Sequence, residues 1–389
     1  MTSEGTIGDT IALRRIRTIG SVLAVLTFML IVWGGHVNTT RSGMAFPDWP
    51  TSNAAPMMTY APSKWLWEGD KFWEHGHRLF ASVVGLVTTI LLVVVYRSVP
   101  RGERPHGLIA GFVGLVFATI VTAIFGVHSM PSGFMELFMV MLAASMIGFA
   151  WTAGRSSGTR RLLWLALAAF AAVCLQGAFG GYTVRNNLPA WTSTTHGMLA
   201  ELFLMTVVGI TFLAHRLLVR WDNGTVSRVV RTMAAATWVL TFVQFFLGAL
   251  TRHTESWGVS VSFPHWDASG FFPSADLFQY GQVLIHFTHR TMAYAVAVAV
   301  VLQWWLVRRQ SSAPHQLRNL TLAAAVIVLV QVLLGAAILW TARGELVTTL
   351  HVMTGVTLLV LNTLSLYTAL ASPVQSSVAV PLVTRQQQG

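Results

Sequence analysis

The stretch EHGHRLFASVVGLVTTILLVVVYR, residues 74–97, joins a histidine-containing start to an apolar run that is long enough to cross a lipid bilayer. A helix needs about 20 apolar residues for this, because each residue adds about 1.5 Å along the helix axis. Comparable runs recur along the whole chain, at 16–36, 76–97, 107–127, 134–154, 161–182, 195–215, 229–251, 282–307, 317–340 and 348–371. The sequence therefore predicts an all-α polytopic membrane protein with about ten transmembrane helices.

The composition agrees with a membrane protein and argues against one that binds nucleic acid. Of the 389 residues, 54% are hydrophobic and 10% are charged, which is more apolar surface than a soluble domain of this length can bury. The formal net charge is +11, but the arginines lie in short linkers rather than on one face, so no nucleic-acid partner is expected. With Cys174 as the single cysteine, a disulfide within the chain is excluded.

Basic residues are distributed unequally between the two sides of the predicted helices. Seventeen Lys and Arg residues fall on one side and six on the other. Since cytoplasmic loops are enriched in Lys and Arg, we expect both termini in the cytoplasm and the two long linkers, 37–73 and 252–281, outside. The run that begins near Thr18 has no small-residue cleavage site after it, so we expect a retained helix rather than a signal peptide.

The chain contains an internal repeat, in which two helical hairpins form a unit that occurs twice. The first helix of a hairpin closes with glycine, as Gly34-Gly35 or as a Gln-x-x-x-Gly ending at 176–180, 244–248 and 331–335. The returning helix then begins with a histidine. These histidines are His77, His196, His289 and His351. We expect a first membrane half over residues 1–220 and a second over 221–389, each built as a four-helix bundle.

The helices expected at 107–127 and 134–154 interrupt this repeat. The first ends in Thr122-Ala-Ile-Phe-Gly126, a degenerate copy of the glutamine–glycine ending, and Ser132 stands where a histidine would be. We therefore expect residues 103–158 to form an extra hairpin that supplies no ligand.

The four histidines share one setting, because each falls within the first turns of a helix that runs inward from the outer face. A neutral imidazole is a good axial ligand for haem iron, and two from facing helices give a six-coordinate site in a bundle core. A lone histidine at a helix end is more often an interfacial residue, whereas four at equivalent repeat positions favour ligands. We predict that His77 pairs with His196, and His289 with His351.

Charged residues beside the first histidine of each pair are candidates for haem chemistry. Arg78 and Arg290 follow that histidine and are placed either to bind a haem propionate or to extend into the interface. Glu74 precedes His77 by one helical turn, and the matching position in the second half is His286. A carboxylate at a haem edge can accept a proton or stabilise a cation; the alternative is a helix N-terminal carboxylate favoured by the helix dipole.

Other polar residues are weaker candidates. Glu136 and Glu201 lie inside apolar runs, where a carboxylate is unfavourable and therefore suggestive, but the repeat assigns them no role. His128, His253 and His286 are expected near the outer face, as interfacial residues or, alternatively, as spare ligands or proton relays.

Taken together, these residues resemble the haem A synthase family in its cysteine-free type. The shared motifs are Ser42-Gly43 with Asp48-Trp49-Pro50 in the first loop, Glu-x-x-His-Arg at 74–78, Gln-x-x-x-Gly-Gly at 176–181 and a second His-Arg at 289–290. The resemblance covers 16–97 and 161–371. The chain departs from the family in two ways. It lacks the cysteine pair that many members carry in an outer loop, and its expected ten helices exceed the family norm of eight because of the extra hairpin.

The resemblance implies an oxidoreductase of a bacterial plasma membrane that oxidises a methyl group of haem O to the formyl group of haem A, with oxygen from water. His77 and His196 would flank the substrate haem, His289 and His351 would bind haem b, and Glu74 would be catalytic. The implied partners are haem O synthase and cytochrome oxidase assembly factors, with an electron acceptor that the sequence does not identify. The pattern is also compatible with a homo-oligomer.

Three rival functions fit part of the pattern. A di-haem cytochrome b for electron transfer explains four histidines but gives no reason for Glu74 or the long outer loops. A non-catalytic haem transporter or chaperone would bind haem transiently. A proton-coupled transporter would use Glu136 and Glu201.

Overall fold

The computed structural model describes residues 3–125, 133–219, 224–268 and 270–374, with side chains from residue 10 onward and without those of 118–125. These parts contain ten α-helices. They are α1 (Ser3–Thr39), α2 (Gly69–Ser98), α3 (His106–Phe125), α4 (Phe134–Gly154), α5 (Gly158–Arg185), α6 (Ala190–Leu218), α7 (Arg228–His253), α8 (Gly281–Arg309), α9 (His315–Trp340) and α10 (Glu345–Ala371). Each predicted run overlaps one helix, and only the run at 107–127 continues past its end, into residues outside the described ranges.

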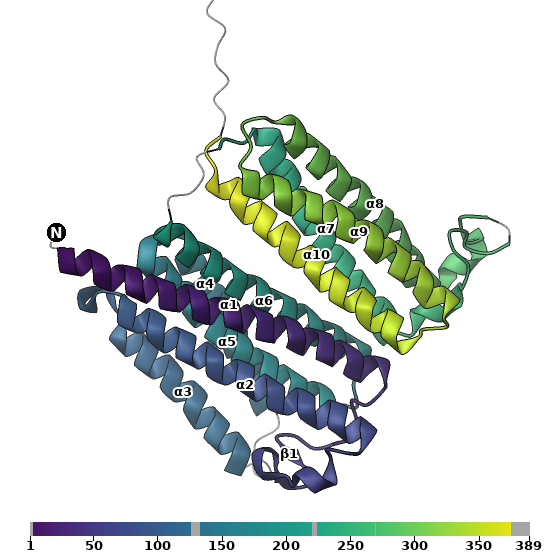
Figure 1. The fold of residues 1–389 in the computed structure, drawn as a ribbon. Coiled ribbons are helices and arrows are strands. Elements are labelled where there is room, and N and C mark those ends of the chain that lie inside the picture. The colour runs from purple at the N-terminus through teal and green to yellow at the C-terminus, as the bar shows by residue number, and fades with distance from the viewer. Residues whose placement is uncertain (1–2, 126–132, 220–223, 269, 375–389) are drawn as a thin grey trace, which may run out of the picture.

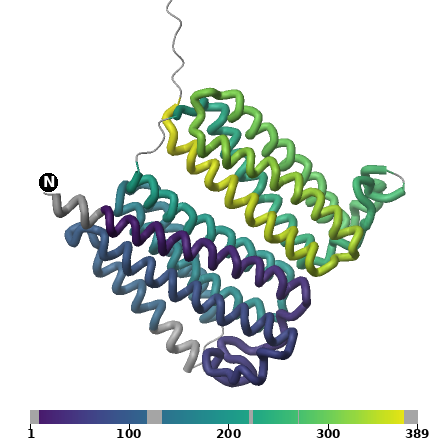
Figure 2. The backbone as a smooth tube through the Cα atoms, viewed as in Figure 1, coloured from purple at the N-terminus to yellow at the C-terminus, as the bar shows by residue number. Residues whose placement is uncertain are grey.

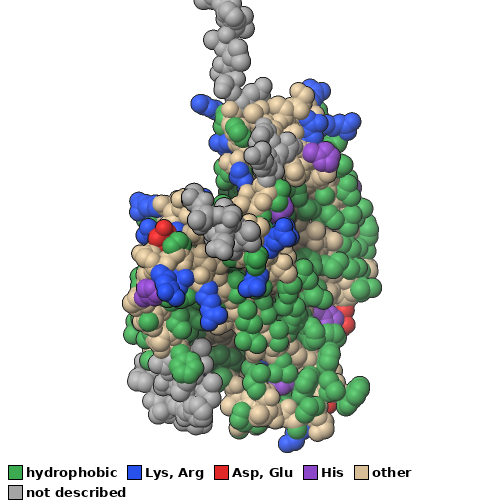
Figure 3. Space-filling model, turned by 60° about the vertical axis from the view of Figure 1, so that its left-hand side comes forward, with side chains coloured by type: hydrophobic (Ala, Val, Ile, Leu, Met, Phe, Trp, Pro, Cys, Tyr) green, Lys and Arg blue, Asp and Glu red, His purple; other side chains and the backbone are tan. Residues whose placement is uncertain are grey.

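Nine of the described helices are long and apolar enough to cross a membrane, and the part of α3 at His106–Phe117 is a shorter apolar helix. Their outward faces carry hydrophobic side chains, which cover much of the flank seen in Figure 3. Such a surface is unstable in water but suits lipid, where helices satisfy their backbone hydrogen bonds internally. The predicted class, an all-α polytopic membrane protein, is confirmed.

The first half is a bundle of α1, α2, α5 and α6. The extra hairpin adds α3, at the outer flank in Figure 1, and α4, which packs against α5. Helix α5 therefore contacts both α4 and the other bundle helices, and it is the most buried of the candidate membrane spans. Its small side chains at 166–172 allow close helix packing. On the other side, the rings of Phe149 and Trp164 stack with centroids 5.9 Å apart, and Phe112 contacts Phe149 at 5.1 Å. The hairpin is thus packed into the first half through its own aromatic core.

The second half is a bundle of α7, α8, α9 and α10 that lies beside the first with its long axis in the same direction (Figure 2). The two halves meet through α1, α6, α7 and α10. Leu204 and Val208 of α6 pack with Val356 of α10 in one buried cluster, and the Tyr367 hydroxyl donates to the carbonyl of Met205 at 3.3 Å. The predicted boundary between the halves, at 220–221, lies outside the described residues, as do His128 and Ser132.

Two loop regions cover the same end of the molecule, where α1 ends and α2 begins (Figure 1). The first holds a two-stranded antiparallel sheet, β1 (Thr51–Ser52) and β2 (Ala55–Pro56), and 3₁₀ turns at Met57–Thr59 and Pro62–Lys64. The second, described except at residue 269, holds 3₁₀ turns at Ser256–Val259 and Ala275–Gln279. A further 3₁₀ turn, at Arg101–Glu103, lies at the other end. The long loops therefore share one face, as the repeat requires.

Candidate functional site

Each of the four repeat histidines lies against a glycine on the helix before it. The gap is so small that a Cβ atom on the glycine would crowd the imidazole Cε1, which explains why the repeat keeps glycine there. Distances from the position of that Cβ to Cε1 are 2.8 Å for Gly34 and His77, 3.0 Å for Gly180 and His196, 3.0 Å for Gly248 and His289, and 3.2 Å for Gly335 and His351. The glycine at each helix end therefore makes room for a histidine ring, and we call these four glycines, Gly34, Gly180, Gly248 and Gly335, the glycine seats.

Three of the four rings also contact the glutamine of the Gln-x-x-x-Gly ending. The amide Nε2 of Gln176 lies 3.3 Å from Nε2 of His196, and that of Gln331 lies 3.3 Å from Nε2 of His351. In the third pair, the Gln244 amide lies 3.1 Å from Nδ1 of His289. A hydrogen bond at one ring nitrogen fixes the ring and leaves the other nitrogen for a metal, as second-shell partners do.

His77 is the exception, because Leu30 stands where the other helices have glutamine, four residues before Gly34. Among the described residues, Nδ1 of His77, His196 and His351 is buried without a hydrogen-bond partner. Buried ring nitrogens without partners are unusual unless a ligand completes them. The donor set therefore fits axial ligation of haem iron.

Both members of each predicted pair, His77 with His196 and His289 with His351, line the same cavity. Across the described ranges, no group of three or more His, Cys, Asp or Glu side chains is placed to hold a metal ion. Haem iron needs only two axial protein ligands, since the macrocycle supplies the others. A pair of histidines therefore meets the need of haem iron for protein ligands.

All four histidines line one continuous cavity of about 1160 Å³ that extends through both halves. This exceeds the upper end of ordinary small-molecule sites, about 1,000 Å³. Side chains of the extra hairpin form part of its wall beside the first pair, among them Val113, Val116 and Phe138. The hairpin therefore helps to shape the cavity.

Glu74 is buried beside His77, with 4% of its surface exposed, and both of its oxygens are bound. Oε1 accepts a hydrogen bond from Nη2 of Arg78 at 2.5 Å, and Oε2 accepts one from the backbone N–H of Phe46 at 2.9 Å. Arg78 also donates to three loop carbonyls, those of Phe46, Asp48 and Thr51, at 2.7 to 3.0 Å. Arg78 therefore holds the first loop and orients Glu74 at the cavity wall.

The first loop is itself braced by Asp48, which accepts hydrogen bonds from the backbone N–H groups of Asn53 and Ala54 at 2.9 and 2.8 Å. Partial burial acts to raise the pKa of Asp48, but hydrogen bonds from Thr51 and from these two N–H groups outweigh it, so the pKa lies below its usual value. A carboxylate that stays ionised keeps the loop closed over Glu74.

In the second half, Arg290 binds the long loop as Arg78 does in the first half, and His286 stands at the position of Glu74. Arg290 donates to the Ser260 hydroxyl at 3.0 Å and to the carbonyls of Pro264 and His265 at 3.2 and 3.0 Å. His286, at the position matching Glu74, is buried, and its Nδ1 has no hydrogen-bond partner among the described residues. The asymmetry seen in the sequence thus becomes a difference in charge: a neutral Arg–Glu pair in the first half and an arginine without a carboxylate in the second.

The structure separates the two weaker glutamate candidates. Glu136 is exposed in the first turn of α4. Glu201 is fully buried, lines the cavity, and has no hydrogen-bond partner for either oxygen within the described residues. The second half has Val356 five residues after His351, where the first half has Glu201 five residues after His196.

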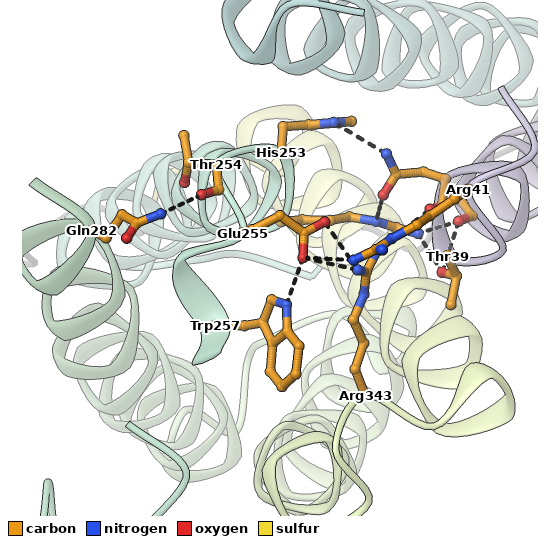
Figure 4. A network of polar contacts seen from close by, with 11 residues as sticks. Thr39, Arg41, His253, Thr254, Glu255, Trp257, Gln282 and Arg343 are labelled. Atoms are coloured by element: carbon orange, nitrogen blue, oxygen red, sulfur yellow. Dashed lines mark hydrogen bonds and ion pairs between the residues drawn. The ribbon is translucent and has the colours of Figure 1, made fainter. Parts of the chain in front are cut away.

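Sequence reasoning missed a polar network that joins the two halves at the loop end (Figure 4). Arg252, near the end of α7, donates to Asn38, Thr39 and the carbonyl of Gly35, all near the end of α1. Arg252 and Arg343 belong to the six basic residues that were predicted on the outer side, and the sequence assigned them no further role. The sequence carried no clear signal for this network, because Arg252 lies four residues after Gly248 whereas Arg343 lies eight residues after Gly335.

Glu255 anchors the other side of this network. It accepts two hydrogen bonds at 3.0 Å from Nη1 of Arg343 and lies 3.6 Å from Nη2 of Arg41. Partial burial acts to raise the pKa of Glu255, but a hydrogen bond from Trp257 and the charges of Arg343 and Arg41 outweigh it, so the pKa is below its usual value. His253, the next residue after Arg252, contacts the Asn38 amide through Nδ1 at 3.3 Å.

Comparison with known proteins shows which family the chain is similar to. The family model described as cytochrome oxidase assembly protein (COX15-CtaA) matches residues 17–145 and 127–363. A "Heme A synthase" of Caulobacter vibrioides is 26% identical, over 85% of this chain and 88% of that protein. Those of Rhizorhabdus wittichii and Brucella anthropi are 24% and 25% identical, over 87% and 81% of this chain and 89% and 81% of those proteins. The two matched ranges overlap at 127–145, where the extra hairpin departs from the repeat.

Proposed function

Because the chain belongs to the family of cytochrome oxidase assembly proteins, we propose that it is a haem A synthase. The observation that carries the proposal is the pair of unequal histidine sites on one cavity, of which only the first has a buried carboxylate, Glu74, beside it. An electron-transfer protein with two equivalent haems has no use for that difference. The haem A synthases to which the chain is similar align with most of its length.

The substrate is haem O, held between His77 and His196. Its methyl group becomes the formyl group of haem A when water supplies the oxygen atom and the electrons leave to an acceptor. Glu74 lies one helical turn before His77, and there its carboxylate stabilises the positive charge that develops at the methyl carbon and takes up a proton. Arg78 fixes this carboxylate, because it binds Oε1 and the loop at the same time.

The second half is the supporting site, where His289 and His351 would hold haem b. When bound, this haem supplies one-electron chemistry. The chain's own contribution is to hold the two rings on Gly248 and Gly335 and to close the site with the loop that Arg290 fastens. Arg78 and Arg290 line the cavity and are also the proposed propionate ligands of their own halves.

Orientation in the membrane follows from the arginine distribution. We place both termini in the cytoplasm of a bacterial cell and both histidine pairs near the outer face of its plasma membrane. Haem O synthase would then supply the substrate, and cytochrome oxidase assembly factors would receive the product.

The test is pyridine-haemochrome analysis of the purified protein after co-expression with a haem O synthase. We expect haem A, or a hydroxylated intermediate, together with haem b. Haem b alone in every preparation would favour a di-haem electron-transfer protein or a haem carrier. That result would contradict the proposal that the protein is a haem A synthase.

A further inference from the structure

The wall of the cavity carries more positive than negative charge where the two halves meet. Arg41, Arg252 and Arg343 line the cavity there together with Glu255, and the other carboxylates of the described lining are Glu74 and Glu201. Glu255 is already shared, because it binds Arg343 at 3.0 Å and lies 3.6 Å from Arg41. The third arginine has no carboxylate within salt-bridge distance among the described residues.

Every hydrogen bond of Arg252 goes to a neutral oxygen, that of the Asn38 amide, the Thr39 hydroxyl or the Gly35 carbonyl. Its Nη1 makes no hydrogen bond within the described part of the chain. A guanidinium is rarely enclosed in protein without an anion, since desolvating an unpaired charge is strongly unfavourable. Arg252 lines the cavity, and an anion bound there would balance its charge and accept hydrogen bonds from its Nη1.

The position of Arg252 points to the kind of anion. Its Nη1 lies 3.7 Å from where a Cβ on Gly35 would be, and Val352 lies 3.1 Å from the same point. Gly35 follows the glycine that seats His77, and Val352 follows His351. The guanidinium thus lies near the chain neighbours of His77 in the first half and of His351 in the second.

We infer that Arg252, with Arg343 and Arg41 behind it, forms a carboxylate-binding subsite that takes a propionate of a haem bound in the cavity. This inference rests on the proposed function, because it requires haem at the histidine pairs. Because Nε and Nη2 of Arg252 are bound to α1, its Nη1 is left to donate charge-assisted hydrogen bonds to a carboxylate. Each haem carries two propionates, and Arg78 and Arg290 use most of their donors on loop oxygens, so a further cationic group is needed.

The inference is tested by titrating the full-length, haem-free protein in detergent with haemin and with haemin dimethyl ester, which lacks free carboxylates. Loss of a hydrogen bond to a charged group weakens binding by about 10- to 100-fold. We expect Arg252→Gln to weaken haemin binding by about that factor and to leave binding of the ester unchanged. The ester therefore reports whether the variant is folded.

Arg252→Lys distinguishes a carboxylate site from a purely structural bridge. It keeps the charge but cannot reproduce the three bonds to α1, so a carboxylate site predicts partial recovery of haemin binding and a bridge predicts none. Arg185→Gln, an exposed arginine on the same side of the membrane, is the matched control and should bind both probes as the unaltered protein does. If Arg252→Gln does not fold, the double variant Arg343→Gln/Arg41→Gln should show a smaller loss of the same kind.

The haem that supplies the propionate is identified by repeating the titration after removing one histidine pair. With His289 and His351 changed to Ala, an effect of Arg252→Gln assigns the propionate to the first-half haem; with His77 and His196 changed to Ala, it assigns it to the second. Equal haemin affinity of Arg252→Gln and the unaltered protein in all backgrounds would overturn the subsite while leaving haem binding intact. Failure of the unaltered protein to bind either probe would instead remove the proposed function.

Discussion

The glycine seats give the sharpest quantitative prediction, because an added methyl group meets a histidine at a known distance. Ordinary contacts of a Cβ atom begin near 3.4 Å, whereas the ring stands at 2.8 Å from the added atom at Gly34, at 3.0 Å at Gly180 and Gly248, and at 3.2 Å at Gly335. Overpacking of this kind costs about 1–3 kcal/mol, which corresponds to about 5- to 150-fold weaker binding by a displaced ligand.

We therefore expect Gly→Ala changes to weaken haem binding in the order Gly34, then Gly180 and Gly248, then Gly335. Changes at Gly34 and Gly180 should affect the first-half haem, and changes at Gly248 and Gly335 should affect the second-half haem. The assay is absorbance titration with haemin at equal protein concentration. Gly148→Ala is the control, since a Cβ there meets nothing within 4 Å and alanine is the better helix former by up to about 1 kcal/mol. Normal haem binding by Gly34→Ala, or an equal loss in Gly148→Ala, would refute the reasoning.

Four further results are expected. Glu74→Ala should retain haem b but form no formyl group, because the first-half carboxylate is gone; a normal haem A yield in pyridine haemochrome would exclude Glu74 from the reaction. His289→Ala or His351→Ala should deplete haem b in the absorption spectrum while first-half binding persists, and unchanged haem b content would disprove the ligand pair. Deletion of 103–158 should weaken haemin binding without abolishing it, because the hairpin lines the cavity but provides no ligand; complete loss would make it integral. The lowered pKa of Glu255 means that its ion pairs contribute stability above its unfolded pKa of about 4.3 and lose it as the pH falls through the lower folded value. The effect on thermal unfolding should be small, because the side chain is 47% exposed, and it should vanish in Glu255→Gln.

Much of the site could be predicted because the repeat constrains it. A histidine that recurs at the start of four helices, each after a helix that ends in glycine, must occupy similar places in both halves. The repeat therefore predicted the four candidate ligands and singled out Glu74 as the residue that breaks the symmetry. The repeat assigned no role to Glu201. Its burial without a hydrogen-bond partner among the described residues depends on which face of α6 turns towards the cavity, and the repeat does not predict that.

The roles of the arginines could not be obtained in this way. Arg78 and Arg290 were expected either to bind a haem propionate or to extend into the interface, and the structure shows that they fasten the two long loops. The carbonyls that they bind include that of Phe46, 32 residues from Arg78 in the sequence, and that of His265, 25 residues from Arg290. Arg252 binds Asn38 across a separation of 214 residues. Such contacts leave no periodic signal, because loop carbonyls are present at every residue and carry no side-chain identity.

The sequence by itself determined the class of protein, the ten helices and the repeat, for one physical reason. Lipid offers no hydrogen bonds to the backbone, so an apolar run of sufficient length has to be a helix, whatever its neighbours are. Only the tertiary structure decided that the two histidine pairs open onto one cavity, that the extra hairpin forms part of its wall, and that three arginines gather between the halves. Those features depend on how helices from distant parts of the chain pack together, and side-chain packing, unlike helix formation in lipid, is not a local property of the sequence.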